Sequence, residues 1–405
     1  MIPRHLEGTI RRAMRTFPAV LITGPRQSGK TTLLRTVWGK THRYVSLENA
    51  DDRSRAQADP RSFLEANPPP VIIDEFQYVP DILTYIKTAI DEARKPGMWL
   101  LTGSQHFPLM HGVSQSLAGR VAVLSLLPFS RSEVDRAEEI SPIEKILNRK
   151  LTSNMASKTR PPDLGDWIIR GAYPEIRANP KVDRFLWCGS YIQTYLERDV
   201  RNILNVGDLE TFERFLKHCA ARTGQLLNYS DLARDTGISV PTAKQWMSVL
   251  VASYQCYLLP PYHASVGKRL VKSPKLYFMD TGLASFLTGQ HDPDAIISGP
   301  QGGAYFETVL LTEWLKIFSN RGEPPSIYFW RSLDGLEVDF IIERNGKLYP
   351  FEVKLTKTVS SRDAQSIEKW RSLTGEKTPA VIYSRVEKPV PVAEGAMALP
   401  WFDIE

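Results

Sequence analysis

The sequence predicts an α/β protein with a parallel-sheet core in its N-terminal part, a largely helical middle and a second α/β unit at its C-terminal end. Three observations lead to this prediction. Short apolar runs alternate with helical stretches between 17 and 129, two helix signals precede a turn-rich hairpin between 226 and 262, and an Asn-Gly turn joins two apolar strands near residue 345. We therefore expect four parts, at 1–135, 136–225, 226–290 and 291–405.

Five apolar runs predict the strands of the first sheet. They are AVLIT (19–23), RYVSLE (43–48), VIIDE (71–75), WLLTGS (99–104) and RVAVLSL (120–126). Continuous apolar strands that alternate with helices are typical of a parallel sheet covered on both faces. The residues before the first strand have dispersed charges, which indicates an amphipathic helix leading into it rather than a signal peptide.

The segment GPRQSGKT (24–31) matches the phosphate-binding pattern G-x-x-x-x-G-K-[ST] in full. An apolar strand enters it and a helix-prone segment leaves it, so backbone N–H groups and the helix dipole would face phosphate oxygens. Lys30 would reach the β- and γ-phosphates of ATP, and the Thr31 hydroxyl would bind Mg²⁺. The expected ATP-binding residues are Gly24, Pro25, Arg26, Gln27, Ser28, Gly29, Lys30, Thr31 and Thr32.

Two adjacent carboxylates end the apolar strand VIIDE. Asp74 would hold the Mg²⁺ ion and Glu75 would polarise the attacking water, whereas the alternative is a solvated strand end. Another strand, RYVSLE, lies between the loop and VIIDE in sequence, which predicts a strand between the two phosphate-handling strands of the sheet. This is the arrangement of P-loop ATPases that carry an additional catalytic glutamate.

Three more residues are candidates for sensing or stabilising the γ-phosphate. Thr102 and Ser104 end the strand WLLTGS, and the sequence does not distinguish between them. Arg120 precedes the next strand, where an arginine would stabilise transition-state charge in its own subunit or in a neighbouring subunit of a homo-oligomer. The alternative for Arg120 is a surface ion pair.

Residues 226–262 resemble a small winged helix. The first helix is expected to begin at a capping Ser230 and end at Gly237, and the second carries Pro241 in its first turn. Positive residues suit contacts with a nucleic-acid backbone, DNA more than RNA, although a solvated hairpin edge is the alternative. The candidate contacts are Lys244, Lys268, Arg269, Lys272 and Lys275.

The C-terminal hairpin brings acidic residues together. Asn345-Gly346 predicts a two-residue type I′ loop, in which Arg344 faces Lys347. By the same count Asp339 faces Glu352 and Glu337 faces Lys354, unless a bulge at Pro350 breaks the register.

Opposed carboxylates are destabilising unless a cation bridges them, so we expect a metal site. Its ligands would be Asp339, Glu352 and Glu307 from a preceding helix, with Lys354 as a catalytic residue that orients water. The alternative is a solvated face with a plain Glu337–Lys354 ion pair.

The whole chain resembles a prokaryotic family of AAA-type P-loop ATPases with a C-terminal winged helix and a restriction-endonuclease-like module. The resemblance is carried by LITGPRQSGKTTL, VIIDEFQYVP, LLTGSQHFPLM, SLAGRV, GAYPE, YLERDV, SPKLYFMDTGL and FET…EVDFII…FEVK. The last set matches the PD-(D/E)xK pattern at Glu307, Asp339, Glu352 and Lys354. The resemblance implies the fold and ATP binding, and the intact last motif argues for nuclease capacity. The leading hypothesis is Mg²⁺-dependent ATP hydrolysis that controls a module able to bind, and to cleave, nucleic acid. The rival hypothesis is a nucleotide-dependent switch or scaffold that holds a partner without cutting it.

Bulk composition fits a globular protein. Hydrophobic residues make up 42% and charged residues 24% of 405 residues, and the formal net charge is +6. Basic charge permits an anionic partner without requiring one. No apolar run is long enough to span a membrane, and the three cysteines form no metal-binding or disulfide pattern. We therefore expect a cytoplasmic protein with no membrane partner.

Overall fold

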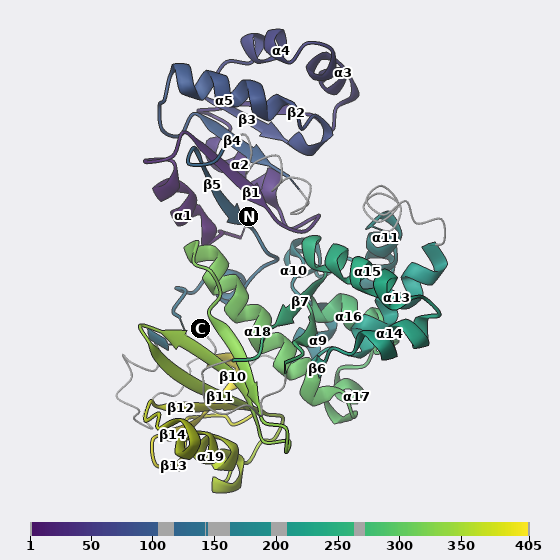
Figure 1. Ribbon diagram of the computed structural model, residues 1–405, viewed down its shortest axis with the longest axis vertical. Helices are drawn as coiled ribbons and strands as arrows, with labels where there is room; N and C mark the ends of the chain where they lie inside the picture. The colour runs from purple at the N-terminus through teal and green to yellow at the C-terminus, as the bar shows by residue number, and fades with distance from the viewer. Residues whose placement is uncertain are drawn as a thin grey trace.

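The computed structural model describes residues 2–103, 117–141, 143–144, 163–195, 209–262 and 272–403. Figure 1 shows the N-terminal sheet and its helices at one end, and the middle and C-terminal parts side by side at the other. Among the described helices, none is long and apolar enough to cross a membrane.

The N-terminal part is a five-stranded parallel sheet with the order β2-β3-β4-β1-β5. Its strands are β1 (Ala19–Thr23), β2 (Arg43–Ser46), β3 (Val71–Asp74), β4 (Trp99–Thr102) and β5 (Val121–Ser125). A strand does separate β1 from β3, as predicted, but it is β4. The expectation that RYVSLE fills this place is wrong, because β2 lies at the sheet edge beyond β3.

Alternating side chains of β1 bury the two faces of this sheet separately. Ala19 and Leu21 pack with α5, whereas Val20 and Ile22 pack with α1 and α2. Both faces are therefore covered, which explains why the strands read as continuous apolar runs. The helices of this part are α1 (Leu6–Ala13), α2 (Lys30–Trp38), α3 (Ala50–Ala58), α4 (Pro60–Ala66), α5 (Ile82–Glu92) and α7 (Arg131–Asp135).

The middle part is mainly helical and ends in a small sheet. Its helices are α9 (Leu164–Arg170), α10 (Pro174–Ala178), α11 (Arg184–Tyr195), α13 (Leu209–Ala221), α14 (Tyr229–Thr236), α15 (Val240–Ala252), α16 (Thr281–Leu287) and α17 (Pro293–Ser298). The strands β6 (Gln225–Leu226), β7 (Cys256–Leu259) and β8 (Lys275–Phe278) pair antiparallel in the order β6-β8-β7. The two predicted helices and the flanking strands are thus present.

The helix caps of this part differ in one detail from the prediction. Ser230 does not cap α14; the Asn228 side chain does, accepting the N–H groups of Ser230 and Asp231. Asparagine is an equally good cap, and it lies one residue before the helix. Gly237 ends α14 in a left-handed conformation, and Pro241 occupies the first turn of α15, both as predicted.

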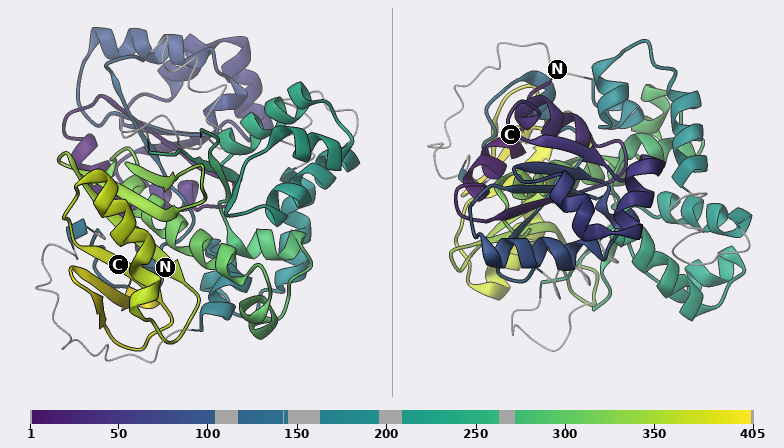
Figure 2. Two further views of the ribbon diagram at one scale, coloured as in Figure 1. Left: turned by 60° about the horizontal axis from the view of Figure 1, so that its bottom comes forward. Right: turned by 90° about the horizontal axis from the view of Figure 1, so that it is seen from above.

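The C-terminal part is a six-stranded mixed sheet with the order β13-β14-β12-β11-β10-β9. Its elements are α18 (Gly302–Arg321), β9 (Ile327–Arg331), β10 (Glu337–Arg344), β11 (Lys347–Lys354), α19 (Gln365–Thr374), β12 (Ala380–Ser384), β13 (Val390–Ala393) and β14 (Ala396–Pro400). Figure 2 shows this sheet next to the middle part. One continuous hydrophobic core runs from α9 through α16 and α18 to the sheet, so the core does not separate at residue 290.

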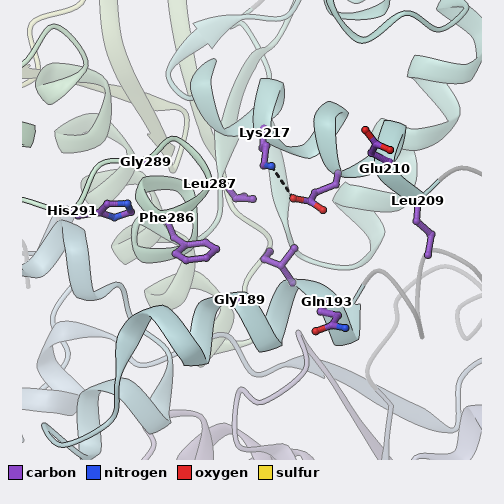
Figure 3. Close-up of a pocket in the computed structure, with 11 residues that line it drawn as sticks. Gly189, Gln193, Leu209, Glu210, Lys217, Phe286, Leu287, Gly289 and His291 are labelled. Atoms are coloured by element: carbon purple, nitrogen blue, oxygen red, sulfur yellow. Dashed lines mark ion pairs between the residues drawn. The ribbon is translucent and has the colours of Figure 1, made fainter.

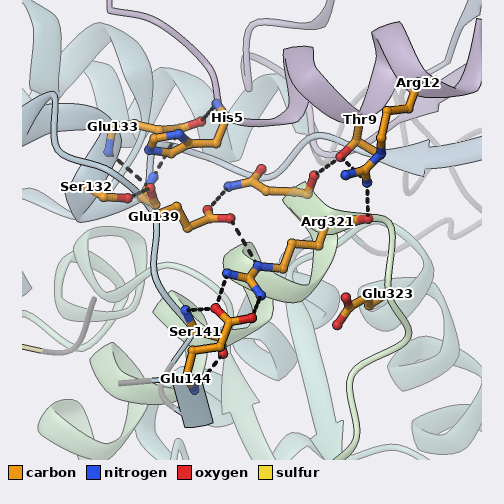
Figure 4. Close-up of polar contacts among 12 residues, drawn as sticks. His5, Thr9, Arg12, Ser132, Glu133, Glu139, Ser141, Glu144, Arg321 and Glu323 are labelled. Atoms are coloured by element: carbon orange, nitrogen blue, oxygen red, sulfur yellow. Dashed lines mark hydrogen bonds and ion pairs between the residues drawn. The ribbon is translucent and has the colours of Figure 1, made fainter. Parts of the chain in front are cut away.

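The C-terminal end of α18 is fastened to the N-terminal part by a polar network (Figure 4). Thr9 donates to the Asn320 carbonyl at 2.5 Å, and the Asn320 amide donates to Glu139 at 2.6 Å. Arg321 donates to both oxygens of Glu144 at 2.8 Å. This junction places α18, which carries Glu307, in contact with helix α1.

Candidate functional site

The loop between β1 and α2 needs glycine at both ends. Gly24 has φ of 141°, and a Cβ there would lie 2.2 Å from the Leu126 carbonyl oxygen. Gly29 has φ of 95° and directly precedes α2. Only glycine adopts these conformations without strain. The loop is therefore a tight cradle whose exit is a helix N-terminus, as the motif predicts.

Two polar side chains of the loop point to an anionic ligand. The buried Lys30 ammonium donates to the Gly24 and Pro25 carbonyls at 3.0 and 2.8 Å. The buried Ser28 hydroxyl has no hydrogen-bond partner among the described residues. A buried hydroxyl without a partner costs free energy. Phosphate oxygens would satisfy the hydroxyl and the ammonium, so the loop fits a nucleotide.

Asp74 is the centre of a hydrogen-bonded group at the end of β3. Its carboxylate accepts from the Thr31 hydroxyl at 2.9 Å, from the Tyr44 hydroxyl at 2.8 Å and from Thr102. Burial and the bond to Asp74 raise the pKa of Tyr44 to about 12. The facing hydroxyl and carboxylate are hard oxygen donors of the kind that Mg²⁺ prefers. Tyr44 lies on β2 and had no signal in the sequence.

Glu75 lies one residue further, with a left-handed backbone at φ of 56°. Its N–H donates to the Thr102 hydroxyl at 3.1 Å, and its carboxylate accepts from Gln77. Burial raises the pKa of Glu75. A carboxylate held at the strand end with a raised pKa suits a general base.

A cleft of about 350 Å³ opens over these residues. The N-terminal part contributes Arg26, Gln27, Gly29, Lys30, Thr31, Thr32 and Glu75, whereas α11 of the middle part contributes Tyr191 and Thr194. The Tyr191 hydroxyl also bonds the Tyr173 hydroxyl at 2.7 Å and accepts from Gln255 at 3.1 Å. The middle part thus forms one wall of the cleft, which sequence spacing could not show.

The candidate sensors and the arginine finger have different outcomes. Thr102 is fully buried and positions Asp74 and the Glu75 backbone, while Ser104 lies outside the described residues. Arg120 precedes β5 at the edge of the parallel sheet opposite the loop, and its guanidinium pairs with Asp91 at 2.6 Å. Within its own subunit Arg120 therefore forms a surface ion pair away from the loop, and a role in a neighbouring subunit stays a prediction.

A second polar group gathers the predicted C-terminal residues. The hairpin register follows the Asn-Gly count from Arg344↔Lys347 to Phe340↔Phe351, with no bulge at Pro350. Asp339 and Glu352 continue the two strands, and the Asp339 carboxylate accepts the Val353 N–H at 2.8 Å. Lys354 pairs with Glu352 at 2.6 Å and with Asp339 at 3.9 Å. The count therefore brings these three side chains together.

Glu337 does not pair with Lys354, so that expectation is wrong. Glu337 pairs with Arg331 at 2.9 Å and closely with Lys275. Lys275 also pairs with Glu307 at 3.4 Å, and its side chain is only 4% exposed. The expected nucleic-acid contact at Lys275 is wrong as well, because β8 directs this lysine into the carboxylate group.

These residues do not fit a metal ion in the arrangement observed. Within the described ranges, no three acidic, histidine or cysteine side chains are placed to hold one. Burial raises the pKa of Glu307 to about 7 and raises the pKa of Glu352 well above its usual range, and Tyr277 donates to Glu307 at 2.9 Å. The predicted ligands Glu307, Asp339 and Glu352 thus share two lysine ammonium groups instead.

The remaining basic candidates are few. Lys244 is exposed on α15, with its ammonium 5.7 Å from the centre of the Tyr229 ring, and Lys272 is exposed before β8. Lys268 and Arg269 lie outside the described residues. The geometry therefore leaves Lys244 and Lys272 as surface cations.

A larger cavity, of about 800 Å³, lies between α11, α13 and α16. Figure 3 shows Phe286 and Leu287 on one side, with Lys217 forming an ion pair across from the aromatic ring. The partner of Lys217 is Glu213, at 2.8 Å. None of the predicted functional residues lines this cavity.

The motifs GAYPE and SPKLYFMDTGL interlock. Asp280 accepts the N–H groups of Ala172 and Leu283, and a Cβ on Gly171 would lie 2.3 Å from its carboxylate oxygen. A Cβ on Gly282 would lie 2.7 Å from the Gly171 nitrogen. These glycines are required by close packing of α9 against α16, which is a structural role.

Comparison with protein families finds three matches along the chain. An AAA domain matches residues 16–135, and two domains of unknown function, DUF8612 and DUF4143, match residues 161–294 and 302–404. The uncharacterized proteins Rv2008c of Mycobacterium tuberculosis and Mb2031c of Mycobacterium bovis are each 32% identical over 366 residues. The alignment covers 90% of this chain and 76% of each relative.

Similar solved structures include the Walker-type ATPase PABY2304 of Pyrococcus abyssi and the RuvB Holliday junction branch migration motor of Thermotoga maritima. Both are 16% identical. The first covers 71% of this chain and 96% of its own, with a TM-score of 0.42; the second covers 63% and 89%, with a TM-score of 0.28. These scores are too low to establish a common overall fold.

Proposed function

Because the chain belongs to the family of these two mycobacterial proteins and carries an AAA domain, we propose that it is a Mg²⁺-dependent ATP hydrolase that works as a nucleotide-driven switch. The observation that carries the proposal is the group formed by Lys30, Thr31, Asp74 and Glu75 beside one cleft. Each side chain has the chemistry that phosphate transfer to water requires.

Binding is the task of the loop and α2. Loop N–H groups and the α2 N-terminus face the phosphates, and Lys30 exchanges its two carbonyl partners for phosphate oxygens. Thr31 and Asp74 would hold Mg²⁺, which when bound neutralises phosphate charge. Thr102 and Tyr44 keep the Asp74 carboxylate in place through their hydroxyl groups.

Hydrolysis is the task of Glu75. Its carboxylate stands at the end of β3 and lines the cleft, where it would orient water and accept a proton. Gln77 holds the same carboxylate. Tyr191 and Thr194 of α11 line the same cleft. Loss of the γ-phosphate would therefore change contacts between the nucleotide and the middle part.

The test is nucleotide binding. A fluorescent ATP analogue titrated onto the full chain with Mg²⁺ should bind in the micromolar range, and Lys30→Ala should weaken it by at least about tenfold. Lys40→Ala, an exposed lysine after the end of α2, is the matched control and should bind like the wild type. Equal binding by the Lys30 and Lys40 variants would exclude this site.

For the middle part we propose a nucleic-acid partner, DNA rather than RNA. The order α13-β6-α14-α15-β7-β8 supports the winged-helix interpretation, and Lys244 and Lys272 are exposed within or beside these elements. Salt-dependent binding of duplex DNA, measured by fluorescence anisotropy, should weaken in the Lys244→Ala, Lys272→Ala double variant. DNA binding that does not change with salt concentration and is the same in the double variant would contradict the proposal.

A specific observation favours the rival form of this function, binding without cleavage. Lys275 and Lys354 pair with the PD-(D/E)xK-type carboxylates, and no three acidic, histidine or cysteine side chains of the described residues are placed to hold a metal ion. Wild-type protein should therefore leave DNA and RNA substrates uncut in Mg²⁺ or Mn²⁺. Cleavage that is lost in Asp339→Ala would restore the nuclease hypothesis.

A further inference from the structure

Lys275 is an unusual residue of the middle part. It begins β8, and its ammonium pairs with Glu307 on α18 and with Glu337 on β10. A lysine is rarely buried this deeply unless it is paired, and the Lys275 side chain is 4% exposed with a carboxylate partner on each of two elements. The Lys275 ammonium is therefore held inside the C-terminal carboxylate group.

Acidic side chains outnumber basic ones in the group. Four carboxylates (Glu307, Glu337, Asp339 and Glu352) face three cationic side chains (Lys275, Lys354 and Arg331). One oxygen of Glu352, Oε1, is buried and has no hydrogen-bond partner among the residues that the structure describes, and the whole residue is only 1% exposed. Such an oxygen points to a missing donor or cation. The group has acceptor capacity that its present partners leave unused.

A metal ion and the Lys275 ammonium would compete for the same oxygens. The ammonium lies between a carboxylate of α18 and a carboxylate of β10, the two elements that would have to contribute ligands jointly. Two positive centres of this kind repel strongly at contact distances in a buried site. Occupancy by one therefore excludes the other.

We propose that Lys275 is a built-in cation that closes the carboxylate group against divalent metal, and that the group binds a divalent ion only when this ammonium leaves it. The proposal rests on the proposed function of binding without cleavage, for which it supplies a physical cause. It explains why the predicted ligands assemble and yet are not arranged as a metal site.

The strand that carries Lys275 also reaches towards the nucleotide loop. β8 pairs with β7 along its whole length. Tyr254, two residues before β7, bonds the Thr23 hydroxyl at 2.8 Å and the Ser125 hydroxyl at 3.0 Å, at the ends of β1 and β5. Tyr254 thus connects the end of β1, directly before the nucleotide loop, to the start of β7, and Lys275 lies at the other end of the same pair of strands, opposite Leu259. This connection is the route by which we propose that nucleotide state acts on Lys275.

The experiment measures Mn²⁺ binding to the full chain without nucleotide, from the electron paramagnetic resonance signal of the free ion. Asp74→Asn is included in every protein so that the nucleotide site does not contribute. The test variant is Lys275→Met with Glu337→Gln, which removes the ammonium together with its partner. It leaves the carboxyl groups of Glu307, Asp339 and Glu352 beside Lys354, and these oxygens are the donors that a divalent ion takes.

We expect the test variant to bind Mn²⁺ at least about tenfold more tightly than the parent, and the gain to vanish when Glu352→Gln is added. The exposed Lys272→Met is the matched control and should bind like the parent. Equal Mn²⁺ affinity of the test variant and the parent would overturn the proposal. A gain in affinity that persists when Glu352→Gln is added would also overturn it.

A second comparison keeps the proposal testable if the test variant does not fold. The parent and its Glu352→Gln form, both with Lys275 in place, should bind Mn²⁺ equally weakly. Tight binding by the parent that is lost with Glu352→Gln would show that Lys275 does not close the site. Because the experiment measures metal binding, its result does not depend on whether the protein hydrolyses ATP or binds DNA.

Discussion

Arg4 holds the nucleotide loop from behind, and its removal tests how the loop is built. Its guanidinium pairs with the buried Glu133 at 2.9 Å and donates to the Ser28 carbonyl at 2.7 Å and the Leu127 carbonyl at 2.5 Å. Both side chains of the ion pair are almost fully buried. Arg4, which lies just before α1, therefore connects the nucleotide loop to the segment that follows β5.

The expected cost of Arg4→Met follows from this burial. Removing one partner of a buried pair leaves an uncompensated charge and costs about 3–5 kcal/mol. Glu133 also accepts the backbone N–H groups of His5 and Ser130, so its charge cannot move into solvent. We expect the free energy of unfolding of the N-terminal part to fall by about 4 kcal/mol.

The assay is urea unfolding of the full chain, with ATP affinity measured in parallel. Arg11→Met is the matched control, because Arg11 lies on the same helix in an exposed pair with Glu7 and should contribute less than about 0.5 kcal/mol. The double variant Arg4→Met, Glu133→Gln should lose less free energy of unfolding than the two single variants lose in sum. If Arg4→Met were no less stable than Arg11→Met and bound ATP equally well, the proposed structural role of Arg4 would be refuted.

The remaining predictions concern catalysis, pH and the Tyr254 contact. Glu75→Gln should reduce phosphate release by about 10²–10⁴-fold while ATP binding persists, and loss of binding instead would contradict its role as base. Arg120→Ala should leave the ATPase rate of dilute protein within about twofold, because Arg120 lies at the far edge of the sheet. Burial raises the pKa of Glu139 to about 7, so the native state binds a proton that the unfolded state lacks between pH 4.5 and 7. Glu139→Gln should therefore be more stable than wild type at pH 8, by up to about 3 kcal/mol, with the gain disappearing near pH 4.5; the exposed Glu138→Gln should show no such trend. Tyr254→Phe should lower stability by about 1–2 kcal/mol through its lost bonds to Thr23 and Ser125, measured by urea unfolding, and an unchanged stability would deny that contact.

Local chemistry was the part of the molecule that sequence could predict. Gly24 and Gly29 are required by backbone geometry, and the Asn345-Gly346 turn determined the hairpin register from Phe340 to Phe351. Both depend on residues close together in the chain. Glycine conformations and turn types are local properties, so the motif and the register could be read correctly.

Long-range packing was the part that sequence could not predict. β4, not β2, separates β1 from β3, because strand order depends on how helices cross the sheet rather than on order along the chain. Lys275 appeared to belong to a basic surface, yet β8 turns it towards Glu307 and Glu337. Tyr191 reaches the nucleotide cleft from a helix more than a hundred residues away. No spacing rule connects such residues.

We propose above that Lys30, Thr31, Asp74 and Glu75 form one ATP-hydrolysing site. The most direct measurement is steady-state release of phosphate from ATP by the full chain in Mg²⁺, compared with Asp74→Asn. We predict turnover by the wild type that requires Mg²⁺ and falls by at least about a hundredfold in the variant. Phosphate release that is unchanged in Asp74→Asn, or absent from well-folded wild-type protein that binds ATP, would contradict this account.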